Sequence, residues 1–315
     1  MFINSLGFYV PEKRIYNDYF AELHKSTADW YLKRTGIHSR SRAENYETLD
    51  YMSIEAVKRA IPNLKYDIKE VDLIIFASYS PEDTVATTGH IVQKEFQIEK
   101  AKTFYVSSAC SSGVNTLEII NSFFKTGIAT KALMLCGDRN SSYSNDNDPQ
   151  SGHLWGDCAT AFFFSNTPTS ESDAEMIDVN TQGLGHIGYG PEAVKLKPKT
   201  TGIEMPYGKD VFTQACTYIS DSTLNILKKN NYSTDELSYF IGHQANNRIL
   251  SHVCKLLEIP EEKSLSNIKE LGNTGCGSSF LVFAQNYDLF KKNDLVCLSV
   301  FGGGYSTGTC LFKFR

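Results

Sequence analysis

A thiol, Cys110, lies among small residues between an apolar segment and an amphipathic one. Residues 103–106 predict a short buried strand, and the apolar residues from Val114 onward recur at helical spacing. Cys110 is therefore expected near the free backbone N–H groups of a first helical turn, where a thiol's pKa is lowered and an oxyanion finds donors. This stretch alone leaves two interpretations open, a reactive nucleophile and a small core residue.

Two other polar residues occupy comparable places in the chain. His243 follows the apolar segment 237–241, and Asn273 lies in a small-residue turn before further apolar residues. We expect all three side chains at the carboxyl ends of strands, where functional residues of α/β sheets gather. The spacing therefore predicts one pocket lined by Cys110, His243 and Asn273.

The elements that would position these residues repeat at about half the chain length. The matching pairs are 72–75 with 239–241, 106–116 with 271–280, 133–137 with 296–301 and 159–164 with 309–314. Strand–helix alternation repeated in this way predicts an α/β protein built from two related halves, at 1–165 and 174–315. The Gly-rich segment from Val179 to Gly208 is expected to be a long loop that covers or binds a ligand.

The composition argues against several classes of protein. A net charge of −5 is not that of a nucleic-acid-binding domain, and no apolar run is long enough to span a membrane. We expect no signal peptide at the start of the chain. The eight cysteines form no CxxC pair, which predicts reduced thiols in a cytoplasmic protein. No His/Cys cluster has metal-ligand spacing and no Gly-rich nucleotide loop is present, so we expect neither metal nor cofactor.

Four motifs together resemble those of the β-ketoacyl-ACP synthase III family, in the same order and spacing. They are Val106–Gly113, Gly242–Asn246, Gly272–Gly275 and Phe301–Tyr305. The resemblance runs over essentially the whole chain. It implies the thiolase fold, with two similar halves, a mixed five-stranded sheet in each, and a five-layer α-β-α-β-α arrangement, usually as a homodimer.

The resemblance also implies roles for the residues of these motifs. Cys110 matches the nucleophile that takes an acyl group from a thioester, and His243 and Asn273 match the pair that decarboxylates a malonyl thioester. The backbone N–H groups of Cys110 and Gly303 match an oxyanion hole. A thiolate attacks a thioester well, and the enolate left by CO₂ needs fixed hydrogen-bond donors. The expected enzyme is a decarboxylating acyltransferase of fatty acid or specialised lipid or polyketide biosynthesis, with thioester substrates and no cofactor.

Further positions match substrate and partner contacts of the family. The implied substrate contacts are Trp30, Arg34, Val85, Asn246 and Phe301. Arg248 and Lys255 lie seven residues apart on one predicted helix, where they share a face that either docks an acidic acyl carrier protein or is simply solvated.

Two departures from the family pattern concern the acyl donor and the acyl chain. The family's second adenine-stacking arginine has no basic counterpart in 147–151, which puts CoA as acyl donor in question and favours a carrier protein. Val85 replaces a residue that is often a bulky aromatic and reaches into the partner subunit's acyl pocket, so a longer pocket is expected.

Two other functions share parts of this pattern. An acyltransferase could move the acyl group from Cys110 to an oxygen or nitrogen nucleophile without decarboxylation, but Asn273 argues against it because enolate stabilisation is the main reason to keep that amide. A non-catalytic partner subunit of another synthase is disfavoured by the intact Cys110, His243 and Asn273.

Overall fold

The computed structural model describes residues 1–196 and 202–315. Nine of its strands form one sheet in the order β5-β4-β6-β7-β1-β8-β11-β10-β9, and β2 pairs with β3 separately. The strands are β1 (Phe2–Tyr9), β2 (Arg14–Tyr16), β3 (Ser39–Ser41), β4 (Leu73–Ala77), β5 (Lys102–Val106), β6 (Lys131–Arg139), β7 (Asp157–Ser165), β8 (Ala174–Gly183), β9 (Tyr239–Gly242), β10 (Leu295–Gly302) and β11 (Ser306–Lys313). The helices are α1 (Asn17–Leu23), α2 (Ala28–Thr35), α3 (Leu49–Ala60), α4 (Thr88–Glu95), α5 (Ser112–Lys125), α6 (Gly208–Lys229), α7 (Asn247–Leu256), α8 (Ile268–Leu271) and α9 (Ser278–Gln285).

The sheet consists of two half-sheets with the same internal order. In the first, β4 pairs parallel with β5 and β6, and β7 and β1 follow antiparallel. In the second, β9 pairs parallel with β10, and β11 and β8 follow antiparallel. This correspondence matches the repeat read from the sequence. The half-sheets join where β1 and β8 pair at Phe2–Glu175 and Ile3–Ala174.

One part of the predicted sheet is corrected. The first half-sheet has the five expected strands, but the second has four among the described residues. The place of a fifth strand is taken by a single parallel bridge between Phe240 and Ser264. β7 ends at Ser165 and β8 begins at Ala174, which are the bounds predicted for the halves. The division into two domains stays a prediction.

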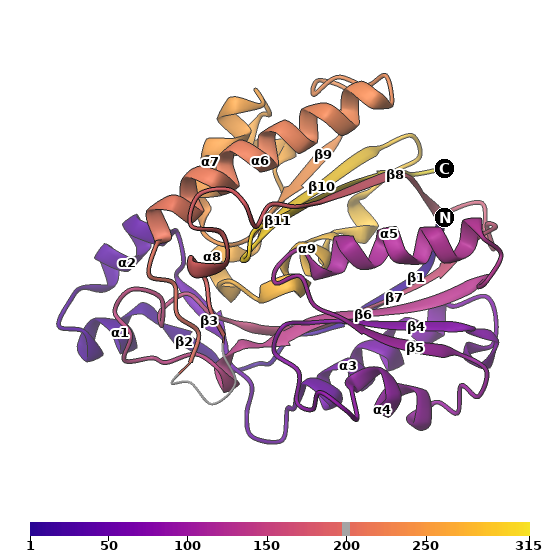
Figure 1. The fold of residues 1–315 in the computed structure, drawn as a ribbon, viewed down its shortest axis with the longest axis horizontal. Helices are drawn as coiled ribbons and strands as arrows, with labels where there is room; N and C mark the ends of the chain where they lie inside the picture. The colour runs from indigo at the N-terminus through magenta and orange to yellow at the C-terminus, as the bar shows by residue number, and fades with distance from the viewer. Residues whose placement is uncertain (197–201) are drawn as a thin grey trace.

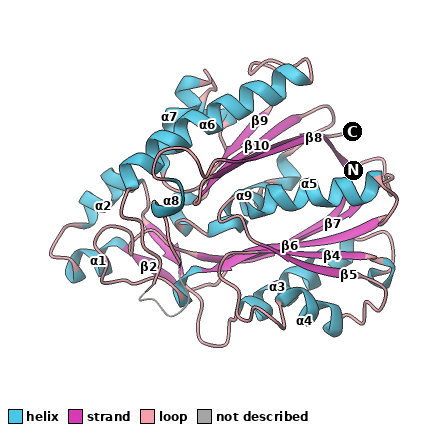
Figure 2. Cartoon of the chain, in the orientation of Figure 1, coloured by secondary structure: helices cyan, strands magenta, loops and turns pink. Residues whose placement is uncertain are grey.

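The helices form three layers that alternate with the half-sheets, as predicted (Figure 1). α3 packs against β1 and β7, with α4 beside it on one outer face, and α6 packs against β10 and β11, with α7 beside it on the other. α5 and α9 lie between the half-sheets. Figure 2 shows this sandwich by secondary structure, with helices on both outer faces and in the middle.

The central layer is held by apolar side chains of α5 and α9. Val114, Leu117 and Ile120 of α5 lie on one helix face and are fully buried together with Phe280 and Phe283 of α9. Burying each such side chain contributes about 1.5–3 kcal/mol. This packing fixes the first turn of α5, and with it Cys110, against the second half of the molecule.

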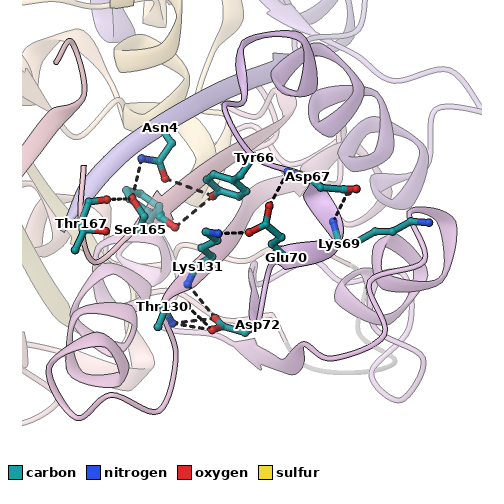
Figure 3. A network of polar contacts seen from close by, with 11 residues as sticks. Asn4, Tyr66, Asp67, Lys69, Glu70, Asp72, Thr130, Lys131, Ser165 and Thr167 are labelled. Carbon is teal, nitrogen blue, oxygen red and sulfur yellow. Dashed lines mark hydrogen bonds and ion pairs between the residues drawn. The ribbon is translucent and has the colours of Figure 1, made fainter. Parts of the chain in front are cut away.

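A polar network lies at the end of the first half-sheet that is opposite to Cys110 (Figure 3). Asn4 Nδ2 donates to Ser165 Oγ at 2.8 Å, and the Tyr66 hydroxyl donates to Asn4 Oδ1 at 3.4 Å. Lys131, at the start of β6, pairs with Glu70. These contacts lie at the start of β6 and the end of β7, away from Cys110. They stabilise the sheet at the end that does not carry the candidate site.

The loop predicted from Val179 begins later than expected, because β8 continues to Gly183. Residues 197–201 of this loop lie outside the described residues. On either side of them, Lys195 and Glu204 exchange two backbone hydrogen bonds of 2.9 Å. Among the described residues, no helix is long and apolar enough to cross a membrane.

Candidate active site

Cys110, His243 and Asn273 line one cavity of about 270 Å³, as predicted. Cys110 comes from the turn between β5 and α5, and His243 directly follows β9. Phe301 and Gly303, from the end of β10 and the turn after it, line the same cavity. The structure therefore brings together five of the predicted site residues from both halves of the chain.

The Cys110 turn has a left-handed residue immediately before the thiol. Ala109 has a φ of 49°, a conformation that strains a residue with a Cβ. The Ala109 carbonyl accepts hydrogen bonds from the backbone N–H and the hydroxyl of Ser112, at 3.1 and 2.6 Å. The Ser111 hydroxyl donates to the Ser108 carbonyl at 2.8 Å. The serines around Cys110 thus hold the turn in the shape that presents the thiol.

The environment of the thiol corrects one expectation. Burial, followed by the negative charge of Asp138, raises the pKa of Cys110 to about 12, although a position before a helix was expected to lower it. Desolvation is the largest cause, because the charged form of the thiol loses its water. Cys110 therefore rests as a neutral thiol.

His243 is a buried, neutral imidazole. Its side chain is 5% exposed, and burial lowers its pKa to about 4. Its Nδ1 atom is buried and has no hydrogen-bond partner among the described residues. At neutral pH the ring therefore carries one N–H and can donate a hydrogen bond without adding a charge.

Asn273 is fixed on three sides. Its backbone N–H donates to the Leu154 carbonyl at 2.8 Å, and its carbonyl accepts from Gly156 N–H at 2.9 Å. Its side-chain Oδ1 accepts from Gly275 N–H at 3.0 Å. Since Oδ1 is occupied, the Nδ2 amide is the group free to donate to a ligand.

The element before Asn273 differs from the prediction. The residue follows the one-turn helix α8 and pairs in an isolated bridge with Trp155, so it is not at the end of a strand. Its place at the cavity depends on this bridge rather than on the sheet.

Sequence reasoning missed a polar group of residues beneath the thiol. Asp138 is fully buried and accepts hydrogen bonds from the Ser78 hydroxyl at 2.8 Å and from Tyr79 N–H at 2.9 Å. It also accepts from Cys276 N–H at 2.7 Å. Tyr79 lines the cavity. The rule applied to His243 would have found both, because Tyr79 follows β4 and Asp138 lies in the last residues of β6.

The remaining wall of the cavity is mainly apolar and comes from the long loop and α6. These lining residues are Val194, Leu196, Ile203, Met205, Val211 and Ala215. A loop that binds a ligand was predicted for this segment, and its described parts do line the cavity. The arrangement leaves a few polar groups facing an apolar chamber, which is typical of sites that bind and orient a small-molecule ligand.

A second, more open hollow of about 410 Å³ lies beside α2 and α7, lined by Trp30, Arg34, Arg248, Thr27, Asp29 and Lys33. Trp30 is 42% exposed, and the Arg34 guanidinium lies 5.0 Å from the centre of its ring. Three of the predicted substrate and partner residues therefore meet outside the thiol cavity.

Three other predicted residues line neither hollow. Asn246 caps α7, because its Oδ1 accepts from Ile249 N–H at 3.1 Å. Val85 is 84% exposed, in the segment between β4 and α4. Lys255 is exposed in the last turn of α7.

Metal binding has no cluster to support it in the described part of the chain, where no group of three or more His, Cys, Asp or Glu side chains is placed to hold an ion. All eight cysteines are free thiols.

Comparison with known proteins agrees with the resemblance seen in the four sequence motifs. Residues 104–185 match the model of 3-oxoacyl-[acyl-carrier-protein (ACP)] synthase III, and residues 227–314 match its C-terminal model. The chain is 31% identical over 313 residues to a β-ketoacyl-[acyl-carrier-protein] synthase III of Ehrlichia canis, covering 99% of this chain and 98% of that protein.

Solved structures agree with this fold. The 3-oxoacyl-[acyl-carrier-protein] synthase III of Aquifex aeolicus superimposes with a TM-score of 0.91 at 28% identity, covering 99% of each chain. The priming β-ketosynthase of the R1128 polyketide pathway gives 0.88 at 23% identity, over 99% of this chain and 95% of that one, a likeness of fold alone. The predicted thiolase fold is confirmed.

Proposed function

Because this chain belongs to the β-ketoacyl-ACP synthase III family, we propose that it condenses an acyl group held on Cys110 with a malonyl thioester, with loss of CO₂. The observation that carries the proposal is the convergence of a thiol, a neutral imidazole and an oriented amide on one apolar-walled cavity. The enzyme is then an acyltransferase of fatty acid or specialised lipid or polyketide biosynthesis.

In the first half-reaction the Cys110 sulfur attacks the carbonyl carbon of an acyl thioester. The new carbon–sulfur bond forms as the donor's thiolate leaves, and the thiol proton ends on that leaving group. The backbone N–H groups of Cys110 and Gly303 are proposed to hold the oxyanion. Gly303 suits this role because an added Cβ would lie 3.0 Å from Val194 Cβ, so the backbone itself borders the cavity.

In the second half-reaction a malonyl thioester binds with its carbonyl oxygen toward His243 and Asn273. The carboxylate leaves as CO₂ and its electron pair becomes an enolate, which the imidazole N–H and the Asn273 amide stabilise. The lowered pKa of His243 matters here, because a protonated ring would quench the carbanion. The enolate then attacks the acyl carbonyl on Cys110, a carbon–carbon bond forms, and the thiolate is released.

The acyl donor is proposed to be an acyl carrier protein, with CoA possible. Arg34 and Arg248 border one hollow with Trp30, and Lys255 lies further along α7. This basic face suits an acidic carrier protein, and Arg248 and Lys255 are its proposed docking residues. Arg34 already covers the Trp30 ring, so an adenine would have to displace it.

We also propose a homodimer in the cytoplasm. β5 is an edge strand of the sheet, and its Phe104 is 43% exposed, which favours pairing with a second copy. Val85, exposed in one subunit, is proposed to reach the partner's acyl pocket and leave room for a long chain. Eight free cysteines favour a reducing compartment.

The test is to follow the two half-reactions separately. Acyl-CoA and acyl carrier protein are offered as donors, and Cys110 acylation is measured by intact mass. Malonyl carrier protein is then added and CO₂ release is measured. We expect acylation followed by stoichiometric CO₂.

Each other outcome has a meaning. Acylation without CO₂ would replace the proposal with transfer to an oxygen or nitrogen nucleophile. The absence of acylation by any donor would favour a non-catalytic partner subunit. Among the residues that the structure describes, no contact favours either alternative.

A further inference from the structure

Tyr79 places a phenol beside the proposed nucleophile, and its hydroxyl is already hydrogen-bonded. The Tyr79 hydroxyl lies 2.7 Å from Asn140 Oδ1, and the side chain borders the same cavity as Cys110. Tyr79 also lies within hydrogen-bonding reach of the Cys110 thiol, where its effect is to lower the pKa of that thiol. The phenol thus lies between the nucleophile and Asn140.

The hydrogen bonds of Asn140 fix the orientation of its side-chain amide. Its Nδ2 donates to the Gly156 carbonyl at 2.8 Å and to the Asn273 carbonyl at 3.2 Å. Its Oδ1 is therefore an acceptor, and the single Tyr79 proton must be donated to it. While Cys110 is a neutral thiol, the Tyr79 oxygen can offer the sulfur only lone pairs, because its one proton is donated to Asn140.

Losing the thiol proton changes this arrangement. A thiolate has no proton to give, so the favourable partner is a hydroxyl that donates to it, and a hydrogen bond to a charged acceptor is stronger than a neutral one. The Tyr79 proton can supply that bond by turning from Asn140 to the sulfur.

We propose that Tyr79 is a positioning residue for Cys110, whose hydroxyl, held by Asn140 in the resting protein, donates to the sulfur once the thiol loses its proton. This assignment rests on the proposed function only in taking Cys110 as the nucleophile. It adds a donor on the face of the sulfur that lies toward the turn after β4.

Other ionisable groups surround the sulfur and are unchanged by altering Tyr79. Asp138 and Cys136 come from β6, His243 follows β9, and Cys276 lies in the turn before α9. Burial and Asp138 raise the pKa of Tyr79 well above its usual value, so the phenol keeps its proton at all pH values of interest.

The test is the rate at which iodoacetamide alkylates Cys110 between pH 7 and 9 in wild type and in Tyr79→Phe. The sulfur–carbon bond forms, iodide leaves and the thiol proton passes to buffer, so the rate follows the thiolate fraction. Without the hydroxyl we expect the line of log rate against pH to shift by about one to two pH units toward higher pH, which makes the reaction roughly 10- to 100-fold slower at a fixed pH. Peptide mass spectrometry and Cys110→Ala assign the label.

Tyr143→Phe is the matched control. The Tyr143 hydroxyl also makes a 2.7 Å hydrogen bond nearby, to the Pro81 carbonyl, but Tyr143 does not line the cavity. We expect its rate to stay within about threefold of wild type. An unchanged or faster rate in Tyr79→Phe, or an equal slowing in Tyr143→Phe, would overturn the proposal.

A second measurement needs no change at Tyr79. The infrared difference spectrum of wild type minus Cys110→Ala isolates the Cys110 S–H stretch. The proposal predicts this stretch at lower wavenumber than that of a free thiol, since a Tyr79 oxygen that faces the sulfur offers it lone pairs. A band at the free-thiol position would also overturn the assignment. Both readouts concern the sulfur alone, so they stand or fall independently of CO₂ release.

Discussion

The Cys110 turn and the Asn273 turn occupy matching places in the two halves and share one backbone feature. In each, the residue before the functional side chain has a left-handed φ, 49° at Ala109 and 71° at Gly272. The first turn follows a full strand, β5, whereas the second follows the short helix α8.

The contacts that hold the two turns differ in kind, hydrogen bonds at the first and close packing at the second. The Ala109 carbonyl is bound by Ser112, three residues away. At Gly272, an added Cβ would lie 2.8 Å from Arg40 Cγ and 2.9 Å from the Leu154 oxygen, atoms far away in the sequence. The Cys110 turn thus combines local serine hydrogen bonds with two from Ser306 of the second half, which contacts Ser111 Oγ at 2.6 Å and donates to the Ser108 carbonyl at 3.2 Å. The Asn273 turn instead depends on close packing of Gly272 against atoms of the first half. Substitutions in the two turns are expected to affect different steps and different stabilities.

The largest difference between the turns concerns chemistry. Cys110→Ala removes the only atom that can carry the acyl group, so acylation should be abolished, while decarboxylation of a malonyl thioester persists because His243 and Asn273 remain. Intact mass and CO₂ release measure the two steps. Loss of both in this variant would contradict the division of roles.

Asn273→Ala should give the reverse pattern. Cys110 should still be acylated, whereas CO₂ release should fall about 10²- to 10³-fold, the usual cost of removing one donor to a developing oxyanion. The same two assays apply. Equal losses in acylation and CO₂ release would show that the Asn273 turn serves both half-reactions.

Gly272→Ala tests the long-range packing of the second turn. Crowding by Arg40 and Leu154 adds to the strain of a positive φ, so we expect a loss of about 4 kcal/mol in the free energy of unfolding. Gly127 is the control, with a φ of 70° and nothing within 4 Å of an added Cβ, and Gly127→Ala should cost about 1 kcal/mol. Urea denaturation measures both. Similar losses of unfolding free energy in the two variants would mean that Arg40 and Leu154 shift to make room for the added Cβ at little cost.

His243 lies on the same cavity as both turns and predicts a pH dependence. Its pKa of about 4 in the fold lies below the usual 6.5, so the unfolded chain binds more protons between these values and stability is lost as pH falls through them. We expect wild type to lose about 3 kcal/mol more than His243→Gln between pH 7 and pH 4. The buried His153, whose pKa is lowered to about 3, is common to both proteins and cancels. Equal losses of stability in wild type and His243→Gln would show that the His243 ring is exposed to water and that its pKa is not lowered.

The smallest effect is expected for Ala109→Gly. Glycine removes the strain of the left-handed φ but adds freedom to the unfolded chain, so the free energy of unfolding should change by less than about 1 kcal/mol. Acylation should be retained, because the serine hydrogen bonds to the backbone remain. A large loss of acylation with unchanged stability would show that the strain itself serves the nucleophile.

Much of the fold was readable from periodicity and from the repeat between halves. The strand–helix alternation fixed the correspondence of β4 with β9 and of β6 and β7 with β10 and β11. The reduction of a fifth strand to the bridge at Ser264 was not readable, because a short segment before a small-residue turn has the same pattern whether or not it pairs. Strand pairing depends on neighbouring strands and side chains, which the local sequence does not specify.

The sequence alone determined which groups are proposed to react, since Cys110, His243 and Asn273 are recognised by residue type, order and spacing. Only the tertiary structure decided their state. Burial against Asp138 makes Cys110 a neutral thiol, and burial keeps His243 uncharged. The physical reason is that a pKa depends on the water and charges around a group, and Asp138 and Tyr79 reach Cys110 only when strands β4 and β6 lie beside its turn.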